Sequence, residues 1–96
     1  MIISVDYDNT YTAAPELFTQ LIKLFQDAGH TVICVTGRGT DMSQPVLDSI
    51  GKLVPCIFAG GEWKRTAAEQ AGYKVNIWID DDPSYIMKQT LLFQKK

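Results

Sequence analysis

Short apolar runs alternate with longer amphipathic stretches along the chain. Four runs rich in β-branched residues predict strands, at residues 2–5, 31–35, 54–59 and 75–79. The stretches between and after them predict helices, over residues 15–28, 43–50, 62–71 and 83–93. The apolar face expected for the first helix comprises Leu17, Phe18, Leu21, Leu24, Phe25 and Ala28. Asp82 before Pro83 predicts the N-cap of the last helix.

Strands that alternate with helices at this short spacing indicate βαβ units and a parallel sheet covered on both faces. The 96 residues suffice for one modest hydrophobic core. We therefore expect a single domain over residues 1–96 with an α/β fold, a three-layer, Rossmann-like arrangement around a parallel sheet of about four strands.

Polar residues follow three of the predicted strands. Asp6, Thr36 and the pair Asp80 and Asp81 all lie at carboxyl ends, which meet at one edge of a parallel sheet. Gathered carboxylates repel one another unless they share a cation or a proton. Oxygen ligands without His or Cys favour Mg²⁺. Thr36 and Lys64 would add the hydroxyl donor and positive charge that a phosphate group needs.

Four short motifs occur in order along nearly the whole chain. They are Asp6-Tyr7-Asp8-Asn9-Thr10 (DxDx[TV]), Val35-Thr36-Gly37, Lys64, and Ile79-Asp80-Asp81. In this order and on these strand ends, the chain resembles the haloacid dehalogenase (HAD) superfamily. A single DxD motif would be weak evidence, whereas four ordered elements are specific.

The resemblance implies a Mg²⁺-dependent phosphohydrolase. Asp6 would be the nucleophile that forms a phosphoaspartyl intermediate. Asp8 would act as general acid and then general base, with a pKa raised toward neutrality. Mg²⁺ would be held by the Asp6 carboxylate, the Asp8 backbone carbonyl and Asp81, with Asp80 as a further or outer ligand. The family pattern places the ligand at the second acidic position, which favours Asp81 over Asp80.

Substrate phosphate would be bound by Thr36 and Lys64, with Gly37 and Arg38 as further candidate contacts. For the lysine, Arg65, Lys52 and Lys74 are nearby alternatives. Three aromatic residues flank the predicted site and could stack on a substrate: Tyr7, Tyr11 and Trp63.

The two places where HAD proteins insert cap domains are both short in this chain. Only residues 11–14 separate the first motif from Pro15, and residues 60–63 separate the third strand from Lys64. We expect a cap-less, open site that accepts a phosphorylated small molecule or an exposed phosphate on a macromolecule. We expect nucleic acid as a partner only where it carries such a phosphate as the substrate. A second subunit of an oligomer could close the open site.

The composition bears on which partners the protein could bind, where it is located and what its cysteines do. A net charge of −2 and a pI near 5.1 give no general attraction to nucleic acid or anionic membranes. No apolar run approaches the length of a membrane span, and the first residues lack signal-peptide features, so we expect a cytoplasmic protein without a membrane partner. Cys34 and Cys56 lack the close spacing of a redox or zinc motif and are interpreted as buried free thiols.

Phosphomonoester hydrolysis is the leading hypothesis, and two others stay open. A HAD-like module could bind metal or phosphate without turnover. A phospho-accepting signalling domain would also be small, parallel and acidic at its strand ends. The order of motifs argues against the signalling domain, because such domains place the acidic pair first and the lysine last.

Overall fold

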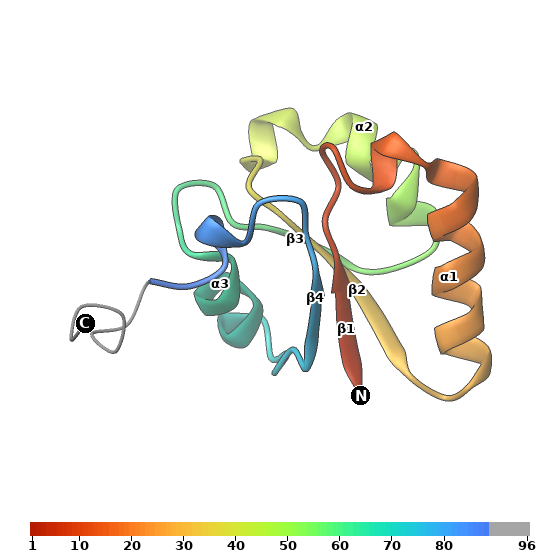
Figure 1. Cartoon of the computed structure of the whole chain (residues 1–96). Helices are drawn as coiled ribbons and strands as arrows, with labels where there is room; N and C mark the ends of the chain where they lie inside the picture. Colours follow the sequence, from red (N-terminus) through yellow and green to blue (C-terminus); the bar gives the residue numbers. More distant parts are fainter. Residues whose placement is uncertain (89–96) are drawn as a thin grey trace, which may run out of the picture.

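The computed structural model describes residues 1–88, which fold around one sheet of four parallel strands. The strands are β1 (Ile2–Val5), β2 (Thr31–Thr36), β3 (Cys56–Phe58) and β4 (Ile77–Ile79). Their order across the sheet is β3-β2-β1-β4 (Figure 1). Ile3 of β1 is paired with Val32 on one side and with Ile77 on the other. The direction of strand addition therefore reverses between β1 and β4, where parallel sheets form a crevice beyond their carboxyl ends.

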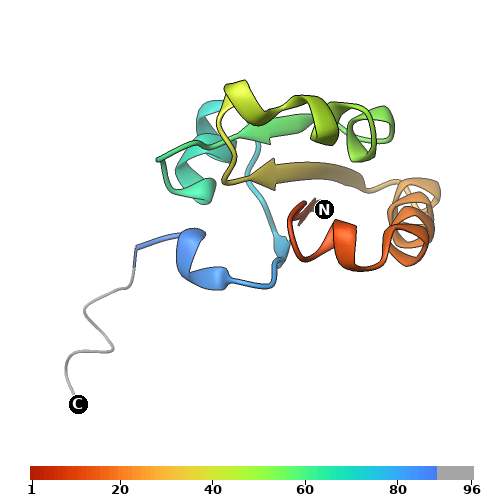
Figure 2. The same cartoon turned by 90° about the horizontal axis from the view of Figure 1, so that it is seen from above.

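Three α-helices connect the strands: α1 (Pro15–Asp27), α2 (Gln44–Leu47) and α3 (Lys64–Gln70). Short 3₁₀ turns lie at Tyr11–Ala13, Thr40–Met42, Ile50–Lys52 and Pro83–Tyr85. Seen from above, α1 lies on one side of the sheet and α3 on the other (Figure 2). No helix in residues 1–88 is long and apolar enough to cross a membrane.

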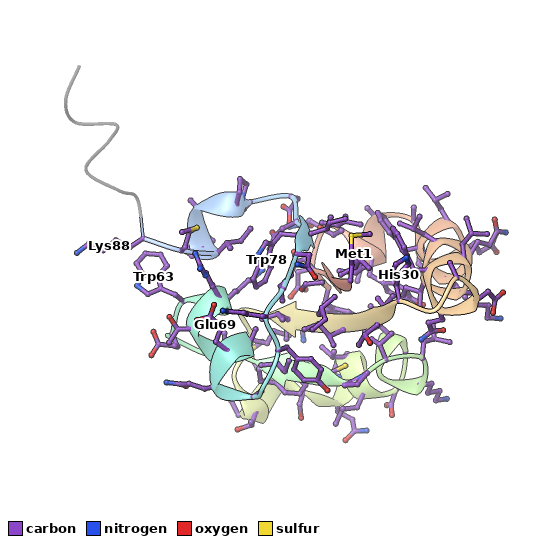
Figure 3. The ribbon with its side chains drawn as sticks, turned by 90° about the horizontal axis from the view of Figure 1, so that it is seen from below. Met1, His30, Trp63, Glu69, Trp78 and Lys88 are labelled. Carbon is purple, nitrogen blue, oxygen red and sulfur yellow. The ribbon has the colours of Figure 1, made fainter. Side chains whose placement is uncertain are left out.

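The two faces of β2 carry two separate apolar clusters, because successive side chains of a strand point to opposite faces. Val32 and Cys34 belong to the larger cluster, which includes Ile22 of α1. Ile33 and Val35 belong to the smaller cluster on the α3 side. Trp78 of β4 packs on that second face (Figure 3). The apolar middle of β2 thus fits a strand covered on both sides.

The four predicted strands and their parallel pairing are confirmed, whereas two helices differ from the prediction. The second predicted helix is a single α turn, Gln44–Leu47, rather than residues 43–50. Ser49 adopts non-helical dihedral angles, and its hydroxyl donates to the Pro45 carbonyl at 2.7 Å. Such a local side-chain bond competes with helix continuation.

The predicted helix over residues 83–93 is wrong in its described part. Asp82 does act as the N-cap, since its carboxylate accepts the Ser84 N–H, but only Pro83–Tyr85 form a 3₁₀ turn. Ile86 is buried, and its carbonyl accepts the Arg65 N–H at 2.8 Å. This contact with α3 replaces the helical bonding pattern. Residues 89–93 of the prediction lie outside the described residues.

The buried face of α1 also differs from the predicted one. Ile22 is fully buried and Phe18 and Phe25 pack beside it, whereas Leu17 and Leu24 are exposed. The helix carries two neighbouring apolar stripes, one with Leu17 and Leu24 and one with Phe18, Ile22 and Phe25. The second stripe is the one that faces the core. These three residues follow helical i, i+4, i+7 spacing.

Candidate active site

A cavity of about 410 Å³ opens at the carboxyl ends of the strands. It is lined by the predicted site residues Asp6, Asp8, Gly37, Arg38, Lys64, Asp80 and Asp81. These residues come from the segments that follow β1, β2 and β4 and from the start of α3, at the upper ends of the strands in Figure 1. The structure therefore brings these segments together at one edge of the sheet, as the sequence predicted.

Asp6 is fixed at the end of β1 by its backbone, whose N–H donates to the Ile79 carbonyl at 2.9 Å. Its carboxylate is buried and accepts a bond from Lys64 Nζ, 2.9 Å from Oδ1. Burial raises the pKa of Asp6 to about 6, although the bond and charge of Lys64 act in the opposite direction. A buried carboxylate at this strand end is thus costly to ionise without a further positive charge.

Lys64 is the first residue of α3 and joins two carboxylates. Its ammonium group lies 2.9 Å from Asp6 Oδ1 and 2.7 Å from Asp80 Oδ2. Burial lowers the pKa of Lys64, but the ion pairs with Asp80 and Asp6 outweigh burial and leave the pKa above its ordinary value. Lys64 therefore stays charged inside the site.

The alternative cations are placed differently within residues 1–88. Arg65 pairs with Glu69 on the exposed side of α3, and neither Lys52 nor Lys74 lines the cavity. The choice of Lys64 over its neighbours thus agrees with the geometry.

Asp80 and Asp81 differ in their surroundings. Both oxygens of Asp80 are occupied, one by Lys64 and the other by the Asp82 N–H at 3.0 Å. Asp81 is exposed. One carboxylate oxygen from each of Asp6, Asp80 and Asp81 lies within 4.8 Å of the other two, close enough to share an ion. Asp81 is the more open donor, whereas Asp80 positions Lys64.

Thr10 links the two ends of this acidic group and was not among the predicted site residues. Its hydroxyl lies 3.4 Å from Asp6 Oδ2 and 3.3 Å from Asp81 Oδ1, and it accepts the Asp81 N–H at 3.1 Å. The signal that could have identified it is its place as the last residue of the DxDx[TV] motif. Thr10 holds the segment after β4 against the segment after β1.

Arg38 binds Asp8 through two parallel hydrogen bonds of 2.9 Å, from Nε and Nη2 to the two carboxylate oxygens. Its third nitrogen donates to the Met42 carbonyl at 3.1 Å, and the guanidinium lies 5.2 Å from the centre of the Tyr7 ring. These bonds lower the pKa of Asp8. The expectation that the surroundings raise this pKa is wrong for the arrangement seen here.

Thr36 does not line the cavity. Its side chain is buried, and its hydroxyl oxygen accepts the Arg38 N–H at 3.2 Å. The neighbouring Gly37 and Arg38 do line it. Thr36 thus shapes the turn that carries Arg38, and its contact with phosphate stays a prediction.

The aromatic residues expected beside the substrate divide into two groups. Tyr7 and Tyr11 are buried and stack on each other with ring centres 6.3 Å apart, so they belong to the core. Trp63 is exposed at the outer edge of the α3 end of the molecule and does not line the cavity (Figure 3). Tyr85 lines the cavity with 61% of its surface exposed. Tyr85 was missed because its segment was assigned to a helix.

The cavity is strongly acidic although the chain is nearly neutral. Its lining contains the acidic residues Asp6, Asp8, Glu62, Asp80, Asp81 and Asp82, against the basic residues Arg38 and Lys64. A phosphate dianion entering this space meets an excess of negative charge. A divalent cation would reverse that balance locally, and the all-oxygen donors suit a hard ion such as Mg²⁺.

Comparisons with known proteins find no matching family model, no similar curated protein and no similar solved structure.

Proposed function

We propose that this chain is a Mg²⁺-dependent phosphomonoesterase with a cap-less HAD-like fold. The observation that carries the proposal is the buried Asp6 carboxylate, bound by Lys64 and placed beside Asp80 and Asp81 in an open cavity. The strand order β3-β2-β1-β4 supports the Rossmann-like topology, since the cavity lies where the order reverses. A nucleophile, a fixed cation and a metal-binding carboxylate in one cavity favour phosphoryl transfer.

The candidate Mg²⁺ ligands are the carboxylates of Asp6 and Asp81 and the backbone carbonyl of Asp8. The carbonyls of Asp6 and Tyr7 accept N–H groups of Tyr11 and Thr12, and the Asp8 carbonyl follows them in the turn. When bound, Mg²⁺ would neutralise the acidic lining and polarise the phosphate.

Asp6 would act as the nucleophile, with one carboxylate oxygen attacking phosphorus while the bond to the leaving oxygen breaks. Lys64 would hold the attacking carboxylate in place and offset the charge that builds on the phosphoryl oxygens. Water would then cleave the phosphoaspartyl bond and release inorganic phosphate. Each of these steps uses a side chain that lines the cavity.

Asp8 would give a proton to the leaving oxygen and later take one from water. In the observed arrangement it is held as a carboxylate by Arg38. Arg38 would therefore have to exchange Asp8 for a substrate oxygen before Asp8 could accept a proton. Its planar guanidinium suits a phosphate as well as a carboxylate.

The same ion pair favours a second candidate function, a module that binds metal or phosphate without turnover. If Arg38 never releases Asp8, the general acid is absent and the site only binds. The two functions are separated by measuring turnover and binding on the same protein.

The test is phosphate release from p-nitrophenyl phosphate, with and without Mg²⁺. Wild type should release phosphate only with Mg²⁺, and Asp6→Asn should reduce kcat by roughly 10³-fold or more because the nucleophile is lost. Asp27→Asn is the matched control, since Asp27 is an exposed residue at the end of α1. A panel of nucleotides, sugar phosphates, phosphopeptides and phosphorylated DNA ends would then identify the substrate class.

Two results would contradict this proposal, the first its nucleophile and the second its turnover. Phosphate release that Asp6→Asn leaves intact would exclude Asp6 as the nucleophile. Saturable binding of Mg²⁺ and of inorganic phosphate, without turnover of any compound in the panel, would instead support the binding module.

A further inference from the structure

The only two cysteines of the sequence lie opposite each other on neighbouring strands. Cys34 of β2 is the register partner of Cys56 of β3, and its N–H donates to the Pro55 carbonyl at 2.9 Å. Both residues pack in the larger apolar cluster, on the α1 side of the sheet. Their distant positions in the sequence gave no indication of this pairing.

The strand geometry suits a covalent bond between the two sulfurs. Neighbouring strands are spaced about 4.8 Å apart, and disulfides join residues whose Cα atoms are roughly 4.4–6.8 Å apart. Register partners in a parallel pair point to the same face, so the two side chains lie next to each other, and the Cys56 thiol donates to the Val54 carbonyl at 3.7 Å. A bond could therefore form without moving either strand far.

We propose that Cys34 and Cys56 form a reversible, peroxide-responsive disulfide that joins β2 to β3. This proposal does not depend on the hydrolase activity proposed above.

The two thiols have unequal access to solvent, which gives each a role. Cys34 is fully buried, whereas Cys56 is only partly buried, so Cys56 meets the oxidant first. The neighbouring Cys34 thiol lowers the pKa of Cys56, while Cys56 and burial raise the pKa of Cys34. The accessible sulfur is therefore the one that ionises more readily to the thiolate, which is the reactive form.

The oxidation is balanced with hydrogen peroxide as the oxidant. The Cys56 thiolate attacks one peroxide oxygen, the O–O bond breaks, and the released hydroxide takes up the thiol proton to give water and a sulfenic acid. The Cys34 sulfur then attacks the Cys56 sulfur, the S–O bond breaks, and the departing hydroxide leaves as water with the Cys34 proton. Two thiols lose two electrons, and one peroxide becomes two waters.

The bond would fasten the strand pair that supports one side of the cavity. Thr36 of β2 is the register partner of Phe58, and its carbonyl accepts the Ala59 N–H at 2.9 Å. The Arg38 carbonyl accepts the Gly60 N–H at 3.2 Å, and both of these residues line the cavity. β3 has only three residues and lies at the sheet edge, where a covalent link restrains local opening.

The experiment treats the full chain with a slight excess of hydrogen peroxide and measures intact mass, free thiols and Tm. We expect a mass lower by two hydrogen atoms, loss of both free thiols, a monomeric product, and a Cys34–Cys56 cross-linked peptide under non-reducing digestion. The disulfide would close the segment between Cys34 and Cys56 into a loop and so restrain the unfolded chain, which should raise Tm by roughly 5 °C or more. Dithiothreitol should reverse all of these changes.

Cys56→Ala is the control, and it should show neither the mass loss nor the Tm increase. The proposal is overturned if wild-type Cys56 gains oxygen atoms while Cys34 stays a free thiol, or if the disulfides formed join separate chains. Both readings come from wild-type protein and do not depend on how well the variant folds.

Discussion

Lys64 supplies the positive charge that two buried carboxylates share. It occupies the first position of α3, yet it points inward and joins Asp6 to Asp80. Breaking a buried pair leaves uncompensated charge in a poorly solvated place, which costs far more than breaking an exposed pair. The residue therefore has a structural role that can be measured without any substrate.

Replacing Lys64 with Met should lower the free energy of unfolding by about 3–5 kcal/mol in Mg²⁺-free buffer at neutral pH. The reason is that Asp6 and Asp80 lose their shared cation. Urea denaturation measures the change, and added Mg²⁺ should restore part of it. Arg65→Met is the matched control, with an expected loss below about 1 kcal/mol because its pair with Glu69 is exposed. Equal losses in the two variants would contradict this role.

Arg38 controls the protonation of Asp8 in the observed arrangement. Removing its two hydrogen bonds by Arg38→Gln should raise the pKa of Asp8 from below its ordinary value. Titrating the side-chain carboxyl carbon by NMR, in Mg²⁺-free buffer, measures the shift. Arg65→Gln should leave the Asp8 curve unchanged. An unchanged curve in Arg38→Gln would mean that the pair does not persist in solution.

At the scale of elements, the sequence predicted those parts that depend on local pattern. Each β-branched run became a strand, since such runs suit a pleated surface covered on both faces. The carboxyl-end placement of Asp6, Asp80 and Asp81 followed from that arrangement, because all parallel strands end at one edge.

Parts that depend on contacts distant in sequence could not be predicted in this way. Asp82 and Pro83 are a typical helix start, yet the Ile86 carbonyl accepts the N–H of Arg65 in α3 instead of a helical partner. The pairing of Arg38 with Asp8 likewise joins two motifs that look independent in the sequence. Thr10 was visible as a motif position, but its bridging role requires β1 and β4 to be neighbours.

The orientation of α1 gives a direct test of its inner face. Ile22→Ala should cost about 2–5 kcal/mol of unfolding free energy, because Ile22 is fully buried in the larger cluster. Leu24→Ala removes a similar side chain that is 71% exposed and should change stability by less than about 0.5 kcal/mol. Chemical denaturation of both variants measures the difference. If Leu24→Ala were the more damaging change, α1 would be rotated from the face described here.

At the scale of the whole molecule, the fold concentrates charge that the composition hides. The chain has a net charge of only −2, whereas six acidic and two basic side chains line one cavity. The strand order brings this about, since β1 and β4 are neighbours and their carboxyl ends carry Asp6, Asp80 and Asp81. Stability should therefore depend on pH and on Mg²⁺ together.

In the Mg²⁺-free protein, the contribution of Asp6 to the free energy of unfolding should fall as the pH rises from about 4 to about 6. The pKa of Asp6 is about 6 in the folded chain, against an ordinary value of 3.8. In this window the native state keeps a proton that the unfolded chain has released, so a rising pH favours unfolding. Mg²⁺ binds the ionised carboxylate and only the folded site, so its stabilisation should be greater at pH 7 than at pH 4.

Urea denaturation at several pH values, with and without Mg²⁺, measures both effects. Asp6→Asn isolates them, because the amide cannot titrate while the other carboxylates still can. Relative to wild type, this variant should gain stability in Mg²⁺-free buffer as the pH rises from 4 to 7 and should respond weakly to Mg²⁺. Parallel pH curves for the two proteins would show that Asp6 titrates near its ordinary pKa. The Lys64 ion pair would then outweigh burial, and the carboxylate would be ionised before any metal arrives.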